Sequence, residues 1–203
     1  MYRTSGKRAL DLILSILLLL MLAPVMVIIA AGVWVTLGPP ILFLQQRPGL
    51  HARPYTLLKF RTMRNACSGA SNLAADRERL TRLGRFLRST SLDELPELFN
   101  VVRGQMSLVG PRPLLMHYLS LYSAEQQRRH DVLPGITGWA QVNGRNAISW
   151  LERFQRDVWY VDHLSFWLDV RILILTVARV WHQHGIHAEG EATMPEFRGN
   201  YQT

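Results

Sequence analysis

Two adjacent carboxylates and a nearby arginine are the residues of this chain best suited to chemistry on a phosphate. Asp93 and Glu94 lie in the run SLDELPELFNVV. Arg112 follows within GPRP, where Pro111 and Pro113 stiffen the backbone on either side of it. The planar guanidinium of arginine suits bidentate contacts with phosphate. Carboxylates beside such a cation repel phosphate unless a divalent cation bridges them. The combination therefore predicts a magnesium-assisted phosphoryl site, with both carboxylates as metal ligands.

Three further cations are candidates for phosphate binding at this site. Arg88 lies just upstream of the carboxylates, and Lys59 and Arg61 lie in the segment KFRTM. A simpler interpretation is that Asp93 is only the N-cap of a helix. Pro96 would then fall in the first helical turn, where its missing N–H costs no hydrogen bond. An aspartate at that position is matched to the helix dipole and should stay ionised.

The elements that must position these residues begin with a long apolar stretch. No Asp, Glu, Lys or Arg occurs from residue 12 to residue 44, whereas a membrane helix needs only about 20 apolar residues. Basic residues flank the stretch on both sides, at Arg3, Lys7 and Arg8 before it and at Arg47, Arg53, Lys59, Arg61 and Arg64 after it. The positive-inside rule places both flanks in the cytoplasm. A helix that enters, breaks at Pro24 and returns would satisfy this rule, and a kinked single span is the alternative.

The remaining pattern predicts a small α/β domain in a mainly helical α+β chain. Residues 41–46 and 54–63 read as two strands of a β-hairpin, and 134–145 as a loop. Helices are predicted over residues 80–88, 93–102, 117–131 and 149–162. The apolar segment 164–181 contains Asp169, Arg171 and Arg179, which favours an amphipathic helix at the membrane interface over a second span.

Composition excludes several classes of protein. The 203 residues include 23 Lys and Arg against 15 Asp and Glu, a net charge of +8, and 48% are hydrophobic. This is an ordinary globular mixture, unlike a disordered tail or a collagen-like fibre. The single cysteine, Cys67, excludes an intrachain disulfide. The charge would suit a membrane-tethered nucleic-acid-binding protein, but acids are interleaved with the bases after residue 75 and no binding motif occurs, so we expect no nucleic-acid partner.

Three segments carry a resemblance to a known family. Residues 59–63 (KFRTM), 91–113 (SLDELPELFNVVRGQMSLVGPRP) and 134–145 (PGITGWAQVNGR) resemble the bacterial sugar transferases, or monotopic phosphoglycosyl transferases. The resemblance extends to about residue 185. It implies transfer of a sugar 1-phosphate from a UDP-sugar to undecaprenyl phosphate, with release of UMP. Within the family, the chain most resembles the transferase that opens bacterial N-linked glycan assembly. That implies an N-acetylated amino sugar donor such as UDP-N,N'-diacetylbacillosamine, with UDP-galactose or UDP-glucose for capsule, O-antigen or exopolysaccharide as the alternative.

The resemblance also implies roles for individual residues. Asp93 falls on the family's nucleophile, which takes the phosphosugar as a covalent intermediate, and Glu94 completes the Asp-Glu dyad; Mg²⁺ is required. The family's Pro-Arg-Pro motif falls on Pro111, Arg112 and Pro113. A carboxylate is a sensible nucleophile because it attacks phosphorus without first losing a proton.

The resemblance finally implies an organisation for the whole chain. The family's re-entrant membrane helix is broken at a proline that matches Pro24. We expect a re-entrant helix over residues 1–38, a cytoplasmic transferase domain over 39–185 and a tail over 186–203. Arg145 is expected to hold the nucleotide or its phosphate, with a structural salt bridge as the alternative. The expected location is the cytoplasmic face of the bacterial inner membrane. Downstream glycosyltransferases are expected as further partners, and a homo-oligomer remains open.

Overall fold

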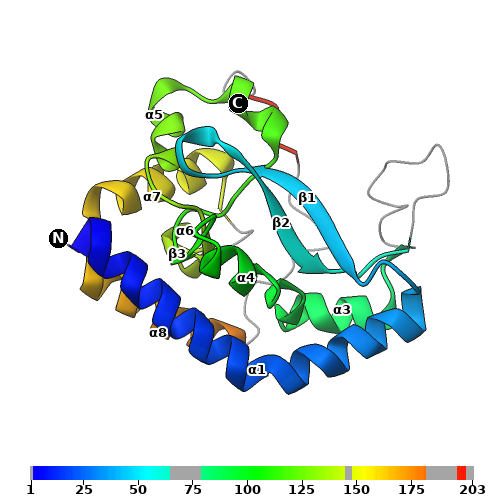
Figure 1. Ribbon diagram of the computed structural model, residues 1–203. Coiled ribbons are helices and arrows are strands. Elements are labelled where there is room, and N and C mark those ends of the chain that lie inside the picture. The colour runs from blue at the N-terminus through cyan, green and yellow to red at the C-terminus, as the bar shows by residue number, and fades with distance from the viewer. Residues whose placement is uncertain (1, 65–78, 145–147, 182–195, 200–203) are drawn as a thin grey trace.

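The computed structural model describes residues 2–64, 79–144, 148–181 and 196–199. A long helix, α1 (Lys7–Leu37), runs along one side of the molecule, with the β-hairpin and the shorter helices above it (Figure 1). The elements after α1 are, in chain order, β1 (Leu42–Pro48), β2 (Pro54–Phe60), α3 (Arg82–Ser89), α4 (Glu97–Val102), β3 (Ser107–Val109), α5 (Ala124–Gln127), β4 (Gly135–Thr137), α6 (Trp139–Val142), α7 (Trp150–His163) and α8 (Phe166–Trp181). The expected mainly helical α+β fold is confirmed.

The helix α1 is long and apolar enough, by length and composition, to cross a membrane. It changes direction part way along its length (Figure 1), and Pro24 lies inside it. A proline removes one backbone hydrogen bond and clashes with the preceding turn, which is a known cause of a kink. One face of the helix packs on the domain, where Ile29 and Val33 are buried. Leu20 and Ile28 on the other face are each 71% exposed.

The beginning of α1 is tied to the domain by polar contacts. The ammonium of Lys7 forms a buried ion pair with Asp169 of α8, at 2.7 Å. The guanidinium of Arg8 donates to the carbonyl oxygens of Val101 and Val102 at the end of α4, at 2.6 and 2.9 Å. These contacts satisfy carbonyl groups that a helix C-terminus leaves without intrahelical partners. The first part of α1 is therefore fixed against both α4 and α8.

The hairpin β1–β2 forms as predicted. The strands are antiparallel, with Leu42 opposite Phe60 and Pro48 opposite Pro54. Tyr55 and Leu57 of β2 lie on one face of the strand and are buried in the core, as the alternation of side chains along a strand requires. Phe60 lies on the other face and is buried in a second cluster with Ile29 and Val33 of α1. The hairpin thereby places Lys59 beside the turn that carries the two carboxylates.

A second, parallel pair of strands was not predicted. In β3 and β4, Ser107 lies opposite Gly135 and Val109 opposite Thr137. The prediction of a loop over 134–145 is therefore wrong for β4 and for the short helix α6. A Cβ atom on Gly135 would lie 2.0 Å from the backbone nitrogen of Gly110, so only glycine allows this close approach. The pair brings the GPRP segment next to the segment that leads into α6.

The helical predictions differ in accuracy. The helices predicted over 80–88, 149–162 and 164–181 correspond to α3, α7 and α8. The single helix predicted over 117–131 is instead two 3-10 helices, Met116–Leu121 and Arg128–His130, on either side of the short α5. One face of α8 is buried in the domain, at Asp169 and Ile172, while Trp167 is 77% exposed. The position of this helix at the membrane interface stays a prediction.

Candidate active site

Asp93 and Glu94 lie in a 3-10 turn, Leu92–Glu94, between α3 and α4. Ser91 precedes the turn with φ of 58°, in the left-handed region, and Pro96 occupies the N-cap position of α4. The prediction that Asp93 caps a helix is therefore wrong, because the helix proper begins one turn later, at Glu97. The carboxylate of Asp93 makes no hydrogen bond to any residue that the structure describes.

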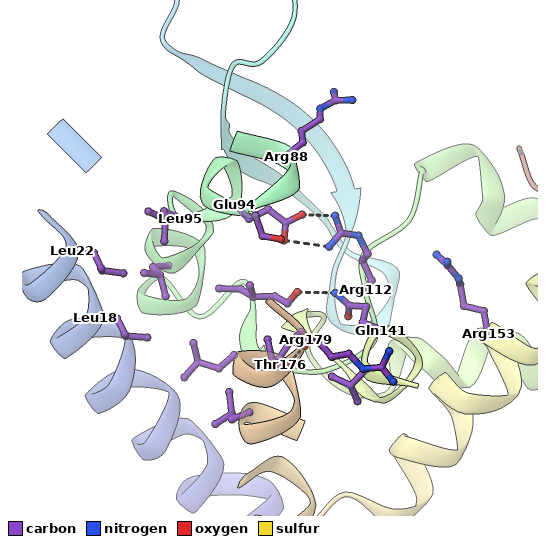
Figure 2. A pocket seen from close by; sticks show the side chains of 17 residues that line it. Leu18, Leu22, Arg88, Glu94, Leu95, Arg112, Gln141, Arg153, Thr176 and Arg179 are labelled. Atoms are coloured by element: carbon purple, nitrogen blue, oxygen red, sulfur yellow. Dashed lines mark hydrogen bonds and ion pairs between the residues drawn. The ribbon is translucent and has the colours of Figure 1, made fainter. Parts of the chain in front are cut away.

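Glu94 is held by two cations. Its Oε1 accepts from Arg112 Nη2 at 2.5 Å and from Lys59 Nζ at 2.7 Å. Its Oε2 accepts from Arg112 Nη1 at 3.4 Å, which completes the two-pronged contact drawn in Figure 2. Burial raises the pKa of Glu94, but the charges of Arg112 and Lys59 outweigh burial and the net effect lowers it. Glu94 is therefore ionised at neutral pH.

The surroundings of Asp93 shift its pKa in the opposite direction. Its side chain is buried, and burial together with the charge of Glu94 raises its pKa to about 6, against the opposing charges of Lys59, Arg88 and Arg112. A desolvated carboxylate without hydrogen bonds is a stronger nucleophile than a solvated one. At neutral pH Asp93 is mostly ionised and is available to attack phosphorus, whereas Glu94 is occupied by its cations.

Glu97 is a third carboxylate of the site that the sequence reasoning missed. It is 2% exposed, and its Oε1 lies 3.1 Å from the ammonium of Lys59. Burial raises the pKa of Glu97 to about 7, in spite of the neighbouring Lys59 charge. Lys59 is thus shared between Glu94 and Glu97. The signal that could have revealed this is the three-residue spacing of Glu94 and Glu97, since residues three apart lie on the same side of a helical segment.

The two remaining predicted cations, Arg88 and Arg61, lie in different parts of the structure. Arg88 lines the cavity at the site, and its Nε donates to Thr62 Oγ1 at 3.1 Å. Arg61 is not among the cavity-lining residues. Its guanidinium instead donates to backbone carbonyls that follow α1, including Pro39 O at 3.1 Å. The structure thus places Arg61 as an anchor for the end of α1. Arg145 lies outside the described residues.

Backbone hydrogen bonds hold the Pro-Arg-Pro motif in place. Pro111 and Pro113 are buried while Arg112 extends toward Glu94. The carbonyl of Pro111 accepts from the backbone N–H of Gly135 at 3.0 Å, and the carbonyl of Arg112 accepts from Arg129 at 2.7 Å. Both contacts fix the backbone that carries the guanidinium.

A cavity of about 400 Å³ opens beside these groups. Figure 2 shows Leu18, Leu22 and Leu95 along one side, and Arg112, Gln141 and Arg153 along the other. Thr176 and Arg179 of α8 also line it. None of Gln141, Arg153 and Arg179 was singled out from the sequence as part of the site, because they come from elements far from the Asp-Glu pair in the chain. One wall of the cavity, with Arg112 and Arg153, is cationic, and the other, with Leu18 and Leu22, is apolar.

The carboxylates are compatible with a magnesium ion. Within the described part of the chain, no group of three or more His, Cys, Asp or Glu residues could hold a metal by itself. Magnesium, however, is commonly bound through one or two carboxylates together with water and substrate phosphates. Glu94 lines the cavity, whereas Asp93, the preceding residue, is buried and is not among the lining residues. The oxygens that would bind the ion are those of Asp93, together with Oε2 of Glu94, whose one contact with Arg112 is 3.4 Å long.

Comparison with known proteins identifies the family. A sequence model described as bacterial sugar transferase matches residues 2–183. The chain is 52% identical to an uncharacterized sugar transferase, EpsL, of Bacillus subtilis, with 96% of both chains covered. It is 44% identical to a UDP-glucose:undecaprenyl-phosphate glucose-1-phosphate transferase of Xanthomonas campestris pv. campestris, covering 90% of this chain and 40% of the relative. It is 35% identical to an undecaprenyl-phosphate galactose phosphotransferase of Salmonella typhimurium, covering 89% of this chain and 41% of the relative. The chain thus spans almost all of the first relative and about two fifths of the other two. It belongs to the bacterial sugar transferase family.

Proposed function

We propose that this protein transfers a sugar 1-phosphate from a UDP-sugar to undecaprenyl phosphate and releases UMP, through a covalent phosphosugar intermediate on Asp93. The observation that carries the proposal is the pair of neighbouring carboxylates whose pKa values are shifted in opposite directions, of which Glu94 lines a cavity with a cationic wall and an apolar wall. A cavity of this kind suits a substrate with a phosphate and a lipid chain. The activities for which the relatives are named support the same substrates.

The reaction consists of two displacements at one phosphorus atom. A carboxylate oxygen of Asp93 attacks the phosphorus that carries the sugar, and the bond from that phosphorus to the bridging oxygen breaks, so UMP leaves with the electron pair. A phosphate oxygen of the acceptor then attacks the same phosphorus. The bond to Asp93 breaks, the carboxylate is regenerated, and the sugar diphosphate lipid forms. Arg112 offsets the repulsion between the carboxylates and the substrate phosphates.

We propose Mg²⁺ as the cofactor, held by Asp93 and Glu94 together with substrate phosphate oxygens. A bound magnesium ion would neutralise charge on the diphosphate and favour departure of UMP. Removal of divalent cations with EDTA should abolish UMP release, and added MgCl₂ should restore it. Full activity in EDTA would contradict this assignment without affecting the family membership.

The decisive experiment follows UMP release without lipid acceptor. Purified protein with labelled UDP-sugar should release up to one UMP per enzyme, and the matching mass increase should map to the peptide containing Asp93. Asp93→Asn keeps the shape of the side chain but removes the anionic nucleophile, so it should release none. Asp131→Asn, at an exposed aspartate, is the matched control and should behave like the wild type. A strict requirement for lipid before any UMP appears would favour direct attack by the acceptor.

The donor sugar is a separate question. The names of the relatives mention glucose and galactose, so they favour UDP-glucose or UDP-galactose over the N-acetylated amino sugar that the sequence resemblance implied. We propose these two hexoses as the first donors to test, with UDP-N,N'-diacetylbacillosamine as the alternative. A screen that compares UMP release with each donor at equal concentration decides between them.

We propose that the protein lies on the cytoplasmic face of the inner membrane, with α1 as a re-entrant helix that does not cross it. Both ends of α1 support this, because Arg8 binds the end of α4 and Arg61 binds the carbonyls that follow the helix. A helix with both ends on one domain has difficulty reaching the far side of a bilayer. Exposed Trp167 and Ile174 suit α8 to the membrane interface.

A further inference from the structure

Both α1 and α8 line the cavity, and both expose large apolar side chains. Leu18 and Leu22 of α1 line it on one side, and Leu173 of α8 lines it on another. The outward faces of the same helices are apolar: Met21 of α1 is 66% exposed and Val177 of α8 is 69% exposed. With these faces in the bilayer, as proposed above, the apolar wall of the cavity lies next to the lipid chains.

Arg179 also lines this cavity, and in Figure 2 its side chain lies on the side of Gln141, across from Leu18 and Leu22 of the apolar wall. It follows Thr176 by one helical turn on α8, and both residues line the cavity. The hydroxyl of Thr176 is within 2.7 Å of Thr137 Oγ1, which ties this part of α8 to β4. No hydrogen bond or ion pair joins Arg179 to another residue within the part of the chain that the structure describes. A cation next to an apolar wall is stabilised when an anion binds there.

The guanidinium of Arg112 is already bound to a carboxylate of the site. Arg112 contacts both carboxylate oxygens of Glu94, so its position is fixed at the end of the cavity where the donor's phosphorus must approach Asp93. Arg179 comes from a different element and is not bound to the carboxylates. Arg88 and Arg153 also line the cavity. Of these four arginines, Arg112 is bound to the carboxylate of Glu94, and Arg179, on α8, provides a separate place for a phosphate.

We propose that Arg179 binds the phosphate of the polyprenyl phosphate acceptor, and that Leu18, Leu22 and Leu173 contact the first isoprene units of its chain. This inference rests on the proposed function, whose second displacement requires such an acceptor. The phosphate of such a lipid would bind the Arg179 guanidinium, and its apolar chain would contact the apolar wall of the cavity. The acceptor's phosphate would then lie between Arg179 and the phosphorus bound to Asp93.

The two half-reactions provide the kinetic test. Arg179→Gln should leave the amount and rate of UMP release without acceptor unchanged. It should raise the KM for polyprenyl phosphate at least tenfold and slow discharge of the covalent intermediate, while Arg179→Lys should recover part of the loss by retaining the charge. Arg85→Gln, at an exposed arginine of α3 that does not line the cavity, is the matched control and should leave all these quantities unchanged. An increased KM for the UDP-sugar, or unchanged kinetics, would overturn the assignment.

Direct binding provides a test that does not depend on activity. Decaprenyl phosphate in nanodiscs of neutral lipid should bind at least tenfold more weakly to Arg179→Gln than to wild type, about 1.4 kcal/mol, and decaprenol should bind weakly to both. Phosphatidylglycerol should not displace decaprenyl phosphate from the wild type. Equal competition would mean that Arg179 contacts bulk anionic lipid, and would overturn the proposal. If wild type releases no UMP with any UDP-sugar, the proposed function fails, and this binding measurement still decides the role of Arg179.

Discussion

At the scale of single residues, the site separates two neighbouring carboxylates. Glu94 receives three contacts from Arg112 and Lys59, while Asp93 receives none from the described residues. The pKa of Glu94 is lowered by these cations, and that of Asp93 is raised by burial and by the charge of Glu94. Carboxylates whose surroundings push their pKa values apart perform different tasks. The geometry thus favours Asp93 as nucleophile and Glu94 as the group that positions cations.

Substitution of Arg112 tests the two-pronged contact. Arg112→Lys keeps one positive charge but cannot contact both oxygens of Glu94 in the same plane, so it is not a conservative change here. We expect kcat/KM to fall at least tenfold, about 1.4 kcal/mol of transition-state stabilisation. Steady-state UMP release measures this loss. Near-normal kinetics would show that the charge alone is sufficient.

Glu97 leads to a prediction about pH and stability. Its pKa is raised from 4.5 to about 7 in the folded protein, chiefly by burial. Between pH 4.5 and 7 the unfolded chain releases this proton and the folded protein retains it, so folding becomes less favourable as pH rises. Glu97→Gln removes this dependence. The melting temperature of the wild type should therefore fall relative to that of the variant as the pH is raised from 4.5 to 7. A difference that is constant over this range would contradict the raised pKa.

The two carboxylates of the site were easier to predict from the sequence than the side-chain contacts around them. Asp93 and Glu94 were predicted because their residue types, with nearby arginines, suit phosphate chemistry, and the structure brings Lys59 and Arg112 to Glu94. The position of Arg61 could not be predicted, because KFRTM does not reveal that its side chain turns toward the carbonyls after α1. Such contacts depend on tertiary packing between segments that are distant in the chain.

At the scale of elements, the longer strands were predicted and the shortest strands were not. Each strand of the hairpin β1–β2 has seven residues, and the two strands flank a turn with Gly and Pro, so both could be recognised in the sequence. Strands β3 and β4 have three residues each, which is too short for any period. The start of α4 was misplaced because a proline is acceptable at several positions of a first helical turn.

The kink in α1 gives a prediction at this scale. Pro24→Ala should restore a backbone hydrogen bond and favour a straighter helix, since alanine is about 3 kcal/mol more favourable than proline inside a helix. A straighter helix cannot keep both Leu18 against the cavity and Val33 in the core. We therefore expect lower turnover and a lower melting temperature in detergent, despite the gain in helix propensity. Val27→Ala, at a position that is 67% exposed, is the control and should leave both unchanged. A more stable and fully active Pro24→Ala variant would contradict the functional importance of the kink.

At the scale of the whole molecule, α1 and the domain behave as one unit. The buried core includes Ile29 and Val33 of α1 together with Phe60 of β2 and Leu87 of α3. Near its other end, the backbone N–H of Leu108 in β3 donates to Asp11, at 3.0 Å. The helix therefore contributes to the domain's core along much of its length while exposing its other face. This combination suits a protein embedded in one leaflet, with its active site close to the membrane surface.

The final prediction concerns the sides of the membrane on which the two flanks of α1 lie. If the helix is re-entrant, both flanks are cytoplasmic. Cysteines introduced by Ser5→Cys and Arg64→Cys, each in a Cys67→Ser background, should both resist a membrane-impermeant maleimide in intact spheroplasts and react after permeabilisation. Both positions are exposed in the structure, so a failure to react in intact cells reflects the membrane barrier and not burial in the protein. Ser5 is preferable to Arg3, because Arg3 donates to the carbonyl of Asp162 at 2.5 Å and its loss would weaken the anchor of α1. A single span requires that one of the two cysteines reacts before permeabilisation. That result would mean that one end of α1 leaves the domain in the bilayer, and it would exclude the re-entrant arrangement.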